Sequence, residues 1–376
     1  MPDQTAGARG PVAFLFLGET LLIPHLWPVV AALAADRDIA IDLWVATSVH
    51  EELLTRWSAP LAHPRLHIRR APGFRSVDGP AAGDNPRLPA KLPLLARLAP
   101  KLWRTPVAVC AEQTSLWLPR LLPMRTRFVK TSHGVGSMSA RDDPRRRAAW
   151  AMCVPSERER ATYLARGFAP DRVIATGYVK ASFAADRTVP RFADQRPVVL
   201  YNPHWQRHRS SWWDWGPALV ERIADDGRWN LIFAPHQRLV ERAGDVRAVA
   251  ASVARRGNVH VDLGSFAGVD GSYPAAADLY LGDTSSQVIE FVARPRPCVF
   301  LNPQAAAWAD DPDFAMWAAG EVVDALDGVL SALARAGERH ADFAMTQAEL
   351  AASSLGATDG SAPGRIAAVI RAALAA

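Results

Sequence analysis

The chain of 376 residues contains little lysine, and its net charge is only +5. Four of its 43 basic residues are lysines, and the others are arginines, whose planar guanidinium groups suit phosphate and carboxylate ligands. A compositional bias of the coding sequence explains the same ratio without any function. A net charge of this size on a chain of this length does not indicate nucleic acid, so no nucleic-acid partner is expected.

Cysteine is also scarce, and no long apolar run is present. Cys110, Cys153 and Cys298 lie far apart, without metal-ligand spacing and in an odd number, which predicts buried thiols in a reducing compartment. The first ten residues do not resemble a signal peptide, and the apolar run 12–17 is too short to span a bilayer. We therefore expect a cytoplasmic protein that needs no metal and no cofactor. Peripheral contact with the inner face of the membrane stays open.

Short apolar runs alternate with helical stretches along most of the chain. This alternation is typical of β-α-β units and parallel sheets. A charged connector at 184–196 interrupts the pattern, which restarts at 198–201. The sequence thus predicts an α/β fold with two doubly wound, Rossmann-like domains. We place an acceptor-side domain at 1–185 and a nucleotide-donor domain at 196–350. A C-terminal helix within 351–376 is a candidate for packing back on the first domain.

The segment from Gly73 to Pro106 breaks this rhythm with several prolines and a basic, apolar stretch at Lys91–Arg104. Its leucines are Leu92, Leu94, Leu95, Leu98 and Leu102. An amphipathic basic helix of this kind can lie on an anionic membrane surface. A helix packed into the core with solvated arginines fits the same pattern, and the sequence favours that interpretation slightly.

Polar side chains follow four strands of the second half at the point where each strand ends. The turns span 202–209, 235–238, 282–286 and 302–303. In open parallel sheets, ligands bind beyond the carboxyl ends of the strands, so these turns are expected to line one crevice. Arg207 and Arg238 are candidate phosphate clamps, because guanidinium groups form bidentate bonds to phosphate.

The turn at 282–286 is the most specific of the four, because three hydroxyl residues open a helix there. Free backbone N–H groups at a helix start, together with small hydroxyl side chains, form a ready anion site. A single N-cap residue would need only one of these hydroxyls. Glu290, one turn further along, is a candidate for binding ribose hydroxyls, although a solvated glutamate there would need no explanation.

His133 follows a predicted strand of the first half and precedes Gly134, which allows a ligand to approach the backbone. A histidine with its usual pKa suits a general base near neutral pH, so His133 is the candidate catalytic residue. Gly18 and Glu19 end the first strand, where they hold the acceptor or cap the next helix. Tryptophans at 205, 212, 213 and 215 stack on a base or sugar, or belong to the core.

These strand ends resemble those of the CDP-glycerol glycerophosphotransferases of teichoic-acid and capsule synthesis. The matching turns are His133-Gly134, Gly177-Tyr178, Pro203-His204-Trp205 with Arg207, Pro235-His236, and Asp283-Thr284-Ser285-Ser286 with Glu290. The resemblance covers about 128–302. It implies a GT-B fold with a crevice between the two domains, a CDP-linked donor, transfer of a polyol phosphate and a location at the cytoplasmic face of the membrane.

The resulting hypothesis is transfer from a CDP-linked donor to a hydroxyl of a glycan or lipid-linked acceptor. His133 takes the proton of the attacking hydroxyl, and His236 stabilises charge on the pyrophosphate together with the hydroxyl turn. Gly18 and Glu19 form the acceptor side. The predicted donor-binding residues are Gly134, His204, Arg207, Arg238, Asp283, Thr284, Ser285, Ser286 and Glu290.

Three alternatives use the same scaffold. A sugar-nucleotide glycosyltransferase would move a glycosyl group instead of a polyol phosphate. A non-hydrolysing sugar-nucleotide epimerase would need acid and base carboxylates facing the sugar, and the sequence does not identify a clear set. A catalytically silent subunit would bind a nucleotide or a partner without turnover.

Overall fold

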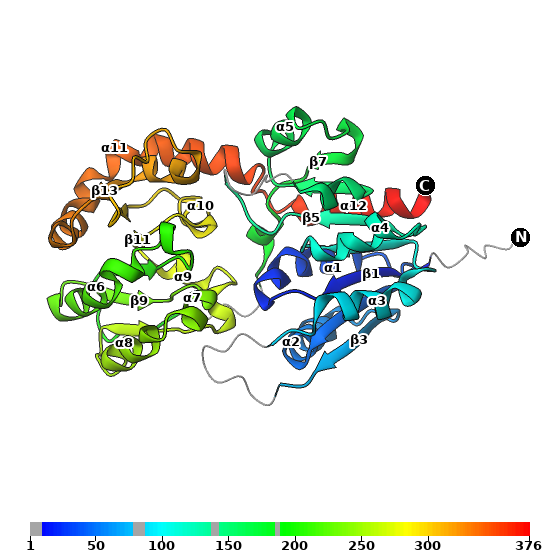
Figure 1. Cartoon of the computed structure of the whole chain (residues 1–376), viewed down its shortest axis with the longest axis horizontal. Helices are drawn as coiled ribbons and strands as arrows, with labels where there is room; N and C mark the ends of the chain where they lie inside the picture. The colour runs from blue at the N-terminus through cyan, green and yellow to red at the C-terminus, as the bar shows by residue number, and fades with distance from the viewer. Residues whose placement is uncertain (1–9, 78–86, 137–142, 185–188) are drawn as a thin grey trace, which may run out of the picture.

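Two α/β domains lie side by side in the computed structural model, which describes residues 10–77, 87–136, 143–184 and 189–376 (Figure 1). The N-terminal domain is built on a sheet of seven parallel strands. From one edge to the other these are β3 (Leu66–Arg75), β2 (Ile41–Thr47), β1 (Val12–Phe16), β4 (Val107–Cys110), β5 (Arg127–Thr131), β6 (Ala151–Val154) and β7 (Val173–Ala175).

Both faces of this sheet are covered by helices, as its strand composition requires. Alternate residues of a strand point to opposite faces of a sheet, so a strand whose sheet is covered on both faces is buried throughout. All five side chains of β1 are buried, as this arrangement requires. Phe14 packs in one core cluster with α1 (Trp27–Leu33) and α2 (Ser48–Ser58). Leu15 packs in the other, which includes residues of α3 (Lys91–Leu102), α4 (Trp117–Leu121) and α5 (Glu157–Ala165).

The C-terminal domain repeats this architecture with six parallel strands. In spatial order they are β10 (Val259–Val261), β9 (Asn230–Phe233), β8 (Val198–Asn202), β11 (Leu279–Gly282), β12 (Cys298–Leu301) and β13 (Glu321–Val323). The helices of this half are α6 (Trp212–Asp226), α7 (Gln237–Arg242), α8 (Asp245–Val253), α9 (Ser272–Ala276), α10 (Ser286–Phe291) and α11 (Val329–Leu355). Both sheets therefore have the doubly wound order that the sequence predicted.

The last two helices lead from the second domain back to the first. Helix α11 begins in the core of the C-terminal domain and reaches α5 of the N-terminal domain at its far end. Helix α12 (Ala362–Ala375) then packs beside α1, with Ile366 and Ile370 buried in the same cluster as Phe14 (Figure 1). The C-terminal helix considered from the sequence thus contributes to the core of the N-terminal domain.

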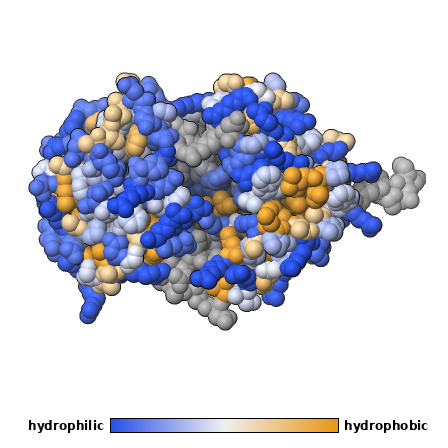
Figure 2. Space-filling view, viewed as in Figure 1, coloured by the Kyte–Doolittle hydropathy of each residue, from blue (hydrophilic) through white to orange (hydrophobic). Residues whose placement is uncertain are grey.

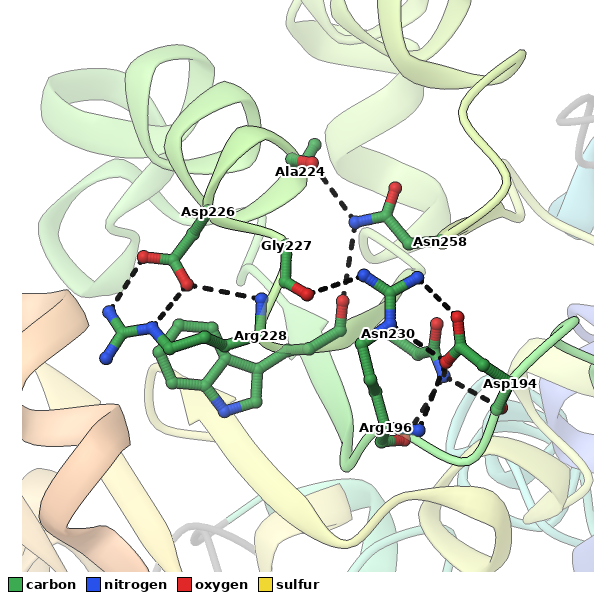
Figure 3. A network of polar contacts seen from close by, with 9 residues as sticks. Asp194, Arg196, Ala224, Asp226, Gly227, Arg228, Asn230 and Asn258 are labelled. Carbon is green, nitrogen blue, oxygen red and sulfur yellow. Dashed lines mark hydrogen bonds and ion pairs between the residues drawn. The ribbon is translucent and has the colours of Figure 1, made fainter.

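A polar network fixes the start of the second domain at the amino ends of the inner strands β8 and β9 (Figure 3). Arg196 bonds to the carboxylate of Asp194 at 2.6 Å and to the carbonyl of Gly227 at 2.6 Å. Asn230, the first residue of β9, donates its side-chain amide to Asp194 Oδ1 at 3.1 Å. These contacts tie the chain just before β8 to the turn between α6 and β9.

Helix α3 occupies most of the stretch at Lys91–Arg104, and its leucines are mainly structural. Four of them, Leu94, Leu95, Leu98 and Leu102, are buried against the sheet. Only Leu92 of those five leucines is exposed, so the structure agrees with the core-packed helix that the sequence slightly favoured for most of this stretch. Within the described ranges, no helix is long and apolar enough to cross a bilayer.

Candidate functional site

The carboxyl ends of β1, β4 and β5 and those of β8, β9 and β11 line three adjoining cavities. His133 and Ser286 contribute to the wall of all three. The central cavity also includes His25, His236 and Glu290. The hydroxyl pocket is lined by His133, Gly134, Val135, His204, Arg209, Thr284, Ser285, Ser286 and Met316. The N-terminal cavity extends from there towards Gly18, Glu19, Lys91, Glu112, Gln113, Thr114, Arg145 and Arg238.

Asp283 lies beneath these cavities and organises two of the turns. Its carboxylate is completely buried and accepts hydrogen bonds from the backbone N–H groups of His204, at 2.8 Å, and Ser211, at 3.0 Å. Burial raises the pKa of Asp283 to about 7, against the opposing effect of these N–H groups. In the structure its carboxylate joins the turn after β11 to the turn after β8 instead of lining a cavity.

The three hydroxyl residues after Asp283 have two roles, which are to cap α10 and to line the hydroxyl pocket. Ser285 caps α10, since its Oγ accepts from the N–H of Gln287 at 3.2 Å. Ser285 also lines the hydroxyl pocket, together with Thr284 and Ser286. The cap explains one of the hydroxyls, and the other two remain available to an anion in the pocket.

His133 lies on the opposite wall, directly after β5, where the first domain faces the hydroxyl turn. Its side chain still reaches solvent through the crevice, but protein atoms surround it closely. This desolvation, followed by the positive charges of Lys130 and Arg146, holds the pKa of His133 below its usual range. The imidazole is consequently neutral at physiological pH, and it is a weaker base than the histidine of usual pKa that the sequence analysis assumed.

Two further imidazoles lie close together in the C-terminal wall. The ring centres of His204 and His236 are 6.0 Å apart. Desolvation and the neighbouring positive charges lower the pKa of His204 to about 4, and desolvation with His204 and Arg238 lowers that of His236 to about 3. Nδ1 of His236 accepts from the N–H of Arg238 at 3.1 Å, so a neutral ring presents its other nitrogen as a donor.

Arg238 and Glu19 connect the two domains across the N-terminal cavity. Nε and Nη2 of Arg238 donate to Oε1 of Glu19 at 3.1 and 2.8 Å. The guanidinium group also lies 5.2 Å from the ring centre of Trp205. In this state Arg238 of the second domain and Glu19 of the first domain are bonded to each other.

Glu290 has strong protein partners of its own. Its carboxylate accepts from the hydroxyl of Tyr178 at 2.7 Å and from Nζ of Lys180 at 2.8 Å. Both partners come from the segment after β7, so the contact joins the first domain to α10. A ribose would therefore meet a carboxylate that is already paired with an ammonium group.

We expect Glu290→Gln to lower the stability to unfolding by roughly 2 kcal/mol. The change leaves Lys180 without its counter-ion, and removal of one member of a fully buried pair costs roughly 3–5 kcal/mol. The smaller figure applies because the two side chains keep 12% and 9% of their surface exposed. Urea unfolding measures the effect. Lys180→Met/Glu290→Gln should recover part of the loss, and equal midpoints for all variants would contradict the argument.

Arg207 was predicted to bind the donor, but the structure places it outside the three cavities. Its side chain is exposed and packs over Trp213, with 5.6 Å to the ring centre, and it lines none of the three cavities. Arg209, two residues later, takes its place in the hydroxyl pocket and pairs with Asp313. The short helical turn at 207–209 directs the two guanidinium groups to different sides.

Several residues that line these cavities were not predicted from the sequence, and three of them are ionisable groups at central positions. His25 is buried in the central cavity, where desolvation and the charge of Lys180 hold its pKa well below its usual range. Lys180 binds Glu290, as described above. Glu112 follows β4 and lines the N-terminal cavity, and burial raises the pKa of its carboxyl group. Among the described residues, Oε2 of Glu112 has no hydrogen-bond partner.

The described part of the chain contains no cluster of three or more His, Cys, Asp or Glu side chains placed to hold a metal ion. The three cysteines are buried and unpaired with one another, and burial raises their pKa values. The cavities are lined by imidazole, hydroxyl, guanidinium and ammonium groups, with the carboxylates of Glu19 and Glu112 in the first domain and of Asp262 and Glu290 in the second. Such a set has the chemistry to bind an anion and to transfer protons.

Comparison with known proteins finds solved structures with the same two-domain architecture. No family model matches the chain, and no curated protein does. Among solved structures, S. aureus MnaA with UDP has a TM-score of 0.65 at 13% identity, covering 97% of both chains. UDP-GlcNAc 2-epimerase from Neisseria meningitidis, bound to UDP-GlcNAc, has a TM-score of 0.61 at 11% identity, covering 97% of this chain and 99% of that one.

The wall teichoic acid polymerase TagF has a TM-score of 0.61 at 12% identity, covering 98% of this chain and 89% of that one. Identities this low show the fold alone. Because the likeness extends over nearly the whole chain and includes both parallel-sheet domains, the protein has the GT-B fold.

Proposed function

We propose that this protein is a GT-B transferase that takes a nucleoside-diphosphate-linked donor, with its diphosphate in the hydroxyl pocket and its nucleoside in the central cavity. The observation that supports this most is the position of His133, which faces both the hydroxyl turn and the N-terminal cavity. A base between a donor pocket and a second cavity is the arrangement that transfer to an acceptor hydroxyl needs.

The proposed chemistry moves a polyol phosphate from a CDP-linked donor to a glycan or lipid-linked acceptor. The acceptor oxygen attacks the phosphorus that carries the polyol, and the bond from that phosphorus to the nucleoside monophosphate breaks. His133 receives the acceptor proton, and the monophosphate leaves with the bonding electrons. Thr284, Ser286 and His236 donate hydrogen bonds to the charge that develops on the phosphate oxygens.

In this proposal the first domain holds the acceptor. Glu19 and Gln113 line the N-terminal cavity, where a carboxylate and an amide can bind acceptor hydroxyl groups. Closure of the domains around the donor would exclude water from the transferred group. The Arg238–Glu19 ion pair must then rearrange when an acceptor enters, since it spans the same space.

A nucleotide screen by thermal shift tests the donor site. CDP at about a hundredfold excess over its dissociation constant should stabilise the protein by roughly 2.7 kcal/mol, and UDP, GDP and ADP should do less. Ser285→Ala/Ser286→Ala should abolish most of the shift, whereas Ser252→Ala, an exposed serine of α8, should preserve it. A shift with UDP alone would replace the cytidine donor by a uridine one. No shift with any nucleotide would contradict the proposal.

A sugar-nucleotide epimerase is the second candidate, and Glu112 is the observation that favours it. A carboxyl group with a raised pKa, beside His133 in one cavity, can serve as the acid or base of a proton transfer at carbon. The epimerase structures with the same fold make this chemistry the main rival. Incubation with UDP-GlcNAc in deuterated water distinguishes the two, because an epimerase needs no acceptor and incorporates solvent deuterium into the sugar.

A further inference from the structure

The outer side of α3 carries an apolar stripe that the core does not use. Leu92, Ala96, Pro100 and Trp103 are exposed and follow one another at spacings of four, four and three residues. Residues at these spacings lie above one another on one face of a helix. Leu92 is 68% exposed and Trp103 is 43% exposed, so the stripe is presented to the surroundings along the whole helix.

The end of α4 adds two more apolar side chains on the same part of the domain. Leu121 is 66% exposed and Leu122 is 37% exposed. The segment that follows α4 is bonded to the last turn of α3, where the hydroxyl of Thr126 donates to the carbonyl of Leu102 at 2.7 Å. In the described residues, four of the six large exposed apolar side chains therefore lie on α3 and α4 or directly after them, and Figure 2 shows apolar atoms gathered over this end of the molecule.

The charged residues in this part of the sequence are nearly all basic. Between residues 87 and 130 the sequence has nine basic residues and one acidic residue, and that one is Glu112 in the N-terminal cavity. The exposed members of the basic set are Arg87, Arg97, Lys101, Arg104, Arg120 and Arg125. An apolar stripe flanked by arginine and lysine is complementary to the interface of an anionic bilayer, where leucine and tryptophan insert and cations meet phosphate groups.

The same helix also forms part of the candidate acceptor site. Lys91, the first residue of α3, and Leu88 just before it line the N-terminal cavity together with His133. A molecule held at the outer side of α3 would therefore enter the cavity past the start of this helix.

We propose that the exposed faces of α3 and α4, with Leu92, Trp103, Leu121, Leu122 and the six exposed basic residues, dock this protein on an anionic lipid bilayer. We call this area the docking surface. Nucleic acid would match the charge but leave the leucines without a role, whereas a bilayer uses both. Delivery of a lipid-linked acceptor to His133 rests on the proposed function, but bilayer binding itself does not.

Vesicle sedimentation of the full chain without nucleotide tests the proposal. Binding is expected to vesicles in which roughly a third of the phosphatidylcholine is replaced by phosphatidylglycerol, and it should weaken as salt increases. Leu92→Ser/Leu121→Ser/Leu122→Ser should lower the partition coefficient by about tenfold or more. The matched control is Met345→Ser on α11, because Met345 is 75% exposed and lies outside the docking surface.

A second set of variants separates the charges from the apolar contacts. Arg97→Gln/Lys101→Gln/Arg104→Gln should also weaken binding about tenfold, and Arg255→Gln on the exposed surface of the other domain should not. Failure to bind anionic vesicles would overturn the proposal. The proposal would also be overturned if the leucine variant bound the vesicles as tightly as the parent chain and the protein bound double-stranded DNA equally tightly. The surface would then recognise polyanions in general. Nucleotide binding, measured on the same samples, reports on the proposed function separately.

Discussion

His133→Ala is expected to reduce turnover by about a hundred- to ten-thousandfold while the affinity for the nucleotide changes little. A positioned general base contributes about this factor, and the variant removes the imidazole that lines both the hydroxyl pocket and the N-terminal cavity. The hydroxyl pocket keeps its serines and threonine, so it should still bind the diphosphate. Steady-state rates with donor and acceptor, beside thermal shifts with the nucleotide, measure the two effects separately.

The pH dependence gives a further check on the same residue. Because crowding in the crevice and nearby cations lower the pKa of His133, its neutral form persists as the pH falls below the usual histidine range. The acidic limb of the rate profile should therefore lie below about pH 6.5. His67→Ala, at an exposed histidine of β3, is the matched control and should leave turnover unchanged. Full activity of His133→Ala would exclude the base assignment.

Asp283→Ala is expected to destabilise the protein by about 4 kcal/mol and to abolish nucleotide binding. The substitution leaves the buried N–H groups of His204 and Ser211 without acceptors, and each unsatisfied donor costs roughly 1–3 kcal/mol. Both turns that wall the hydroxyl pocket lose their common anchor. Thermal unfolding measures the stability, and the nucleotide screen measures binding.

Asp310→Ala serves as the matched control, because Asp310 is an exposed aspartate of the same domain. It should change neither property. If Asp283→Ala unfolds like the parent chain, the carboxylate does not support the two turns. If it is destabilised but binds CDP normally, the turns keep their geometry without it, and the pocket is more rigid than this account requires.

The layer architecture was predictable because buried parallel strands are short, apolar and separated by helices. The four strands expected before the polar turns of the second half are present as β8, β9, β11 and β12, whereas β13 was missed because only Glu321–Val323 pair with β12. Helix α2 was missed too, since Ser48–Ser58 mixes charged residues with few apolar ones. The length of β3, which extends to Arg75, was not predictable either, because most of its side chains are not buried and leave no apolar pattern.

The site was only partly predictable, for a reason of geometry. The rule that ligands meet the carboxyl ends of strands identified His133, His236 and the hydroxyl turn correctly as neighbours of one crevice. Applied to β4, whose residues 107–110 form a short apolar run in the sequence, the same rule would have pointed to Glu112. His25 could not be found this way, because it lies in a helical turn at Thr20–His25 and reaches the cavity only through the packing of the two domains.

The direction of a side chain is likewise hidden from the sequence. Nothing in the local sequence distinguishes Arg207 from Arg209, yet Arg207 faces solvent and Arg209 lines the hydroxyl pocket. The ion pairs of Arg238 with Glu19 and of Glu290 with Lys180 join residues more than a hundred positions apart. Such pairs follow from how the two domains meet, which no local pattern encodes.

The return of α12 to the first domain has a consequence for synthesis on the ribosome. The core around α1 stays open on one side until Ile366 and Ile370 have left the exit tunnel, although the rest of that domain was made long before. The second domain, whose strands and helices lie between 198 and 355, can close its core earlier. The half that is translated first is thus the half that finishes folding last, with its unfilled groove exposed to chaperones in the meantime.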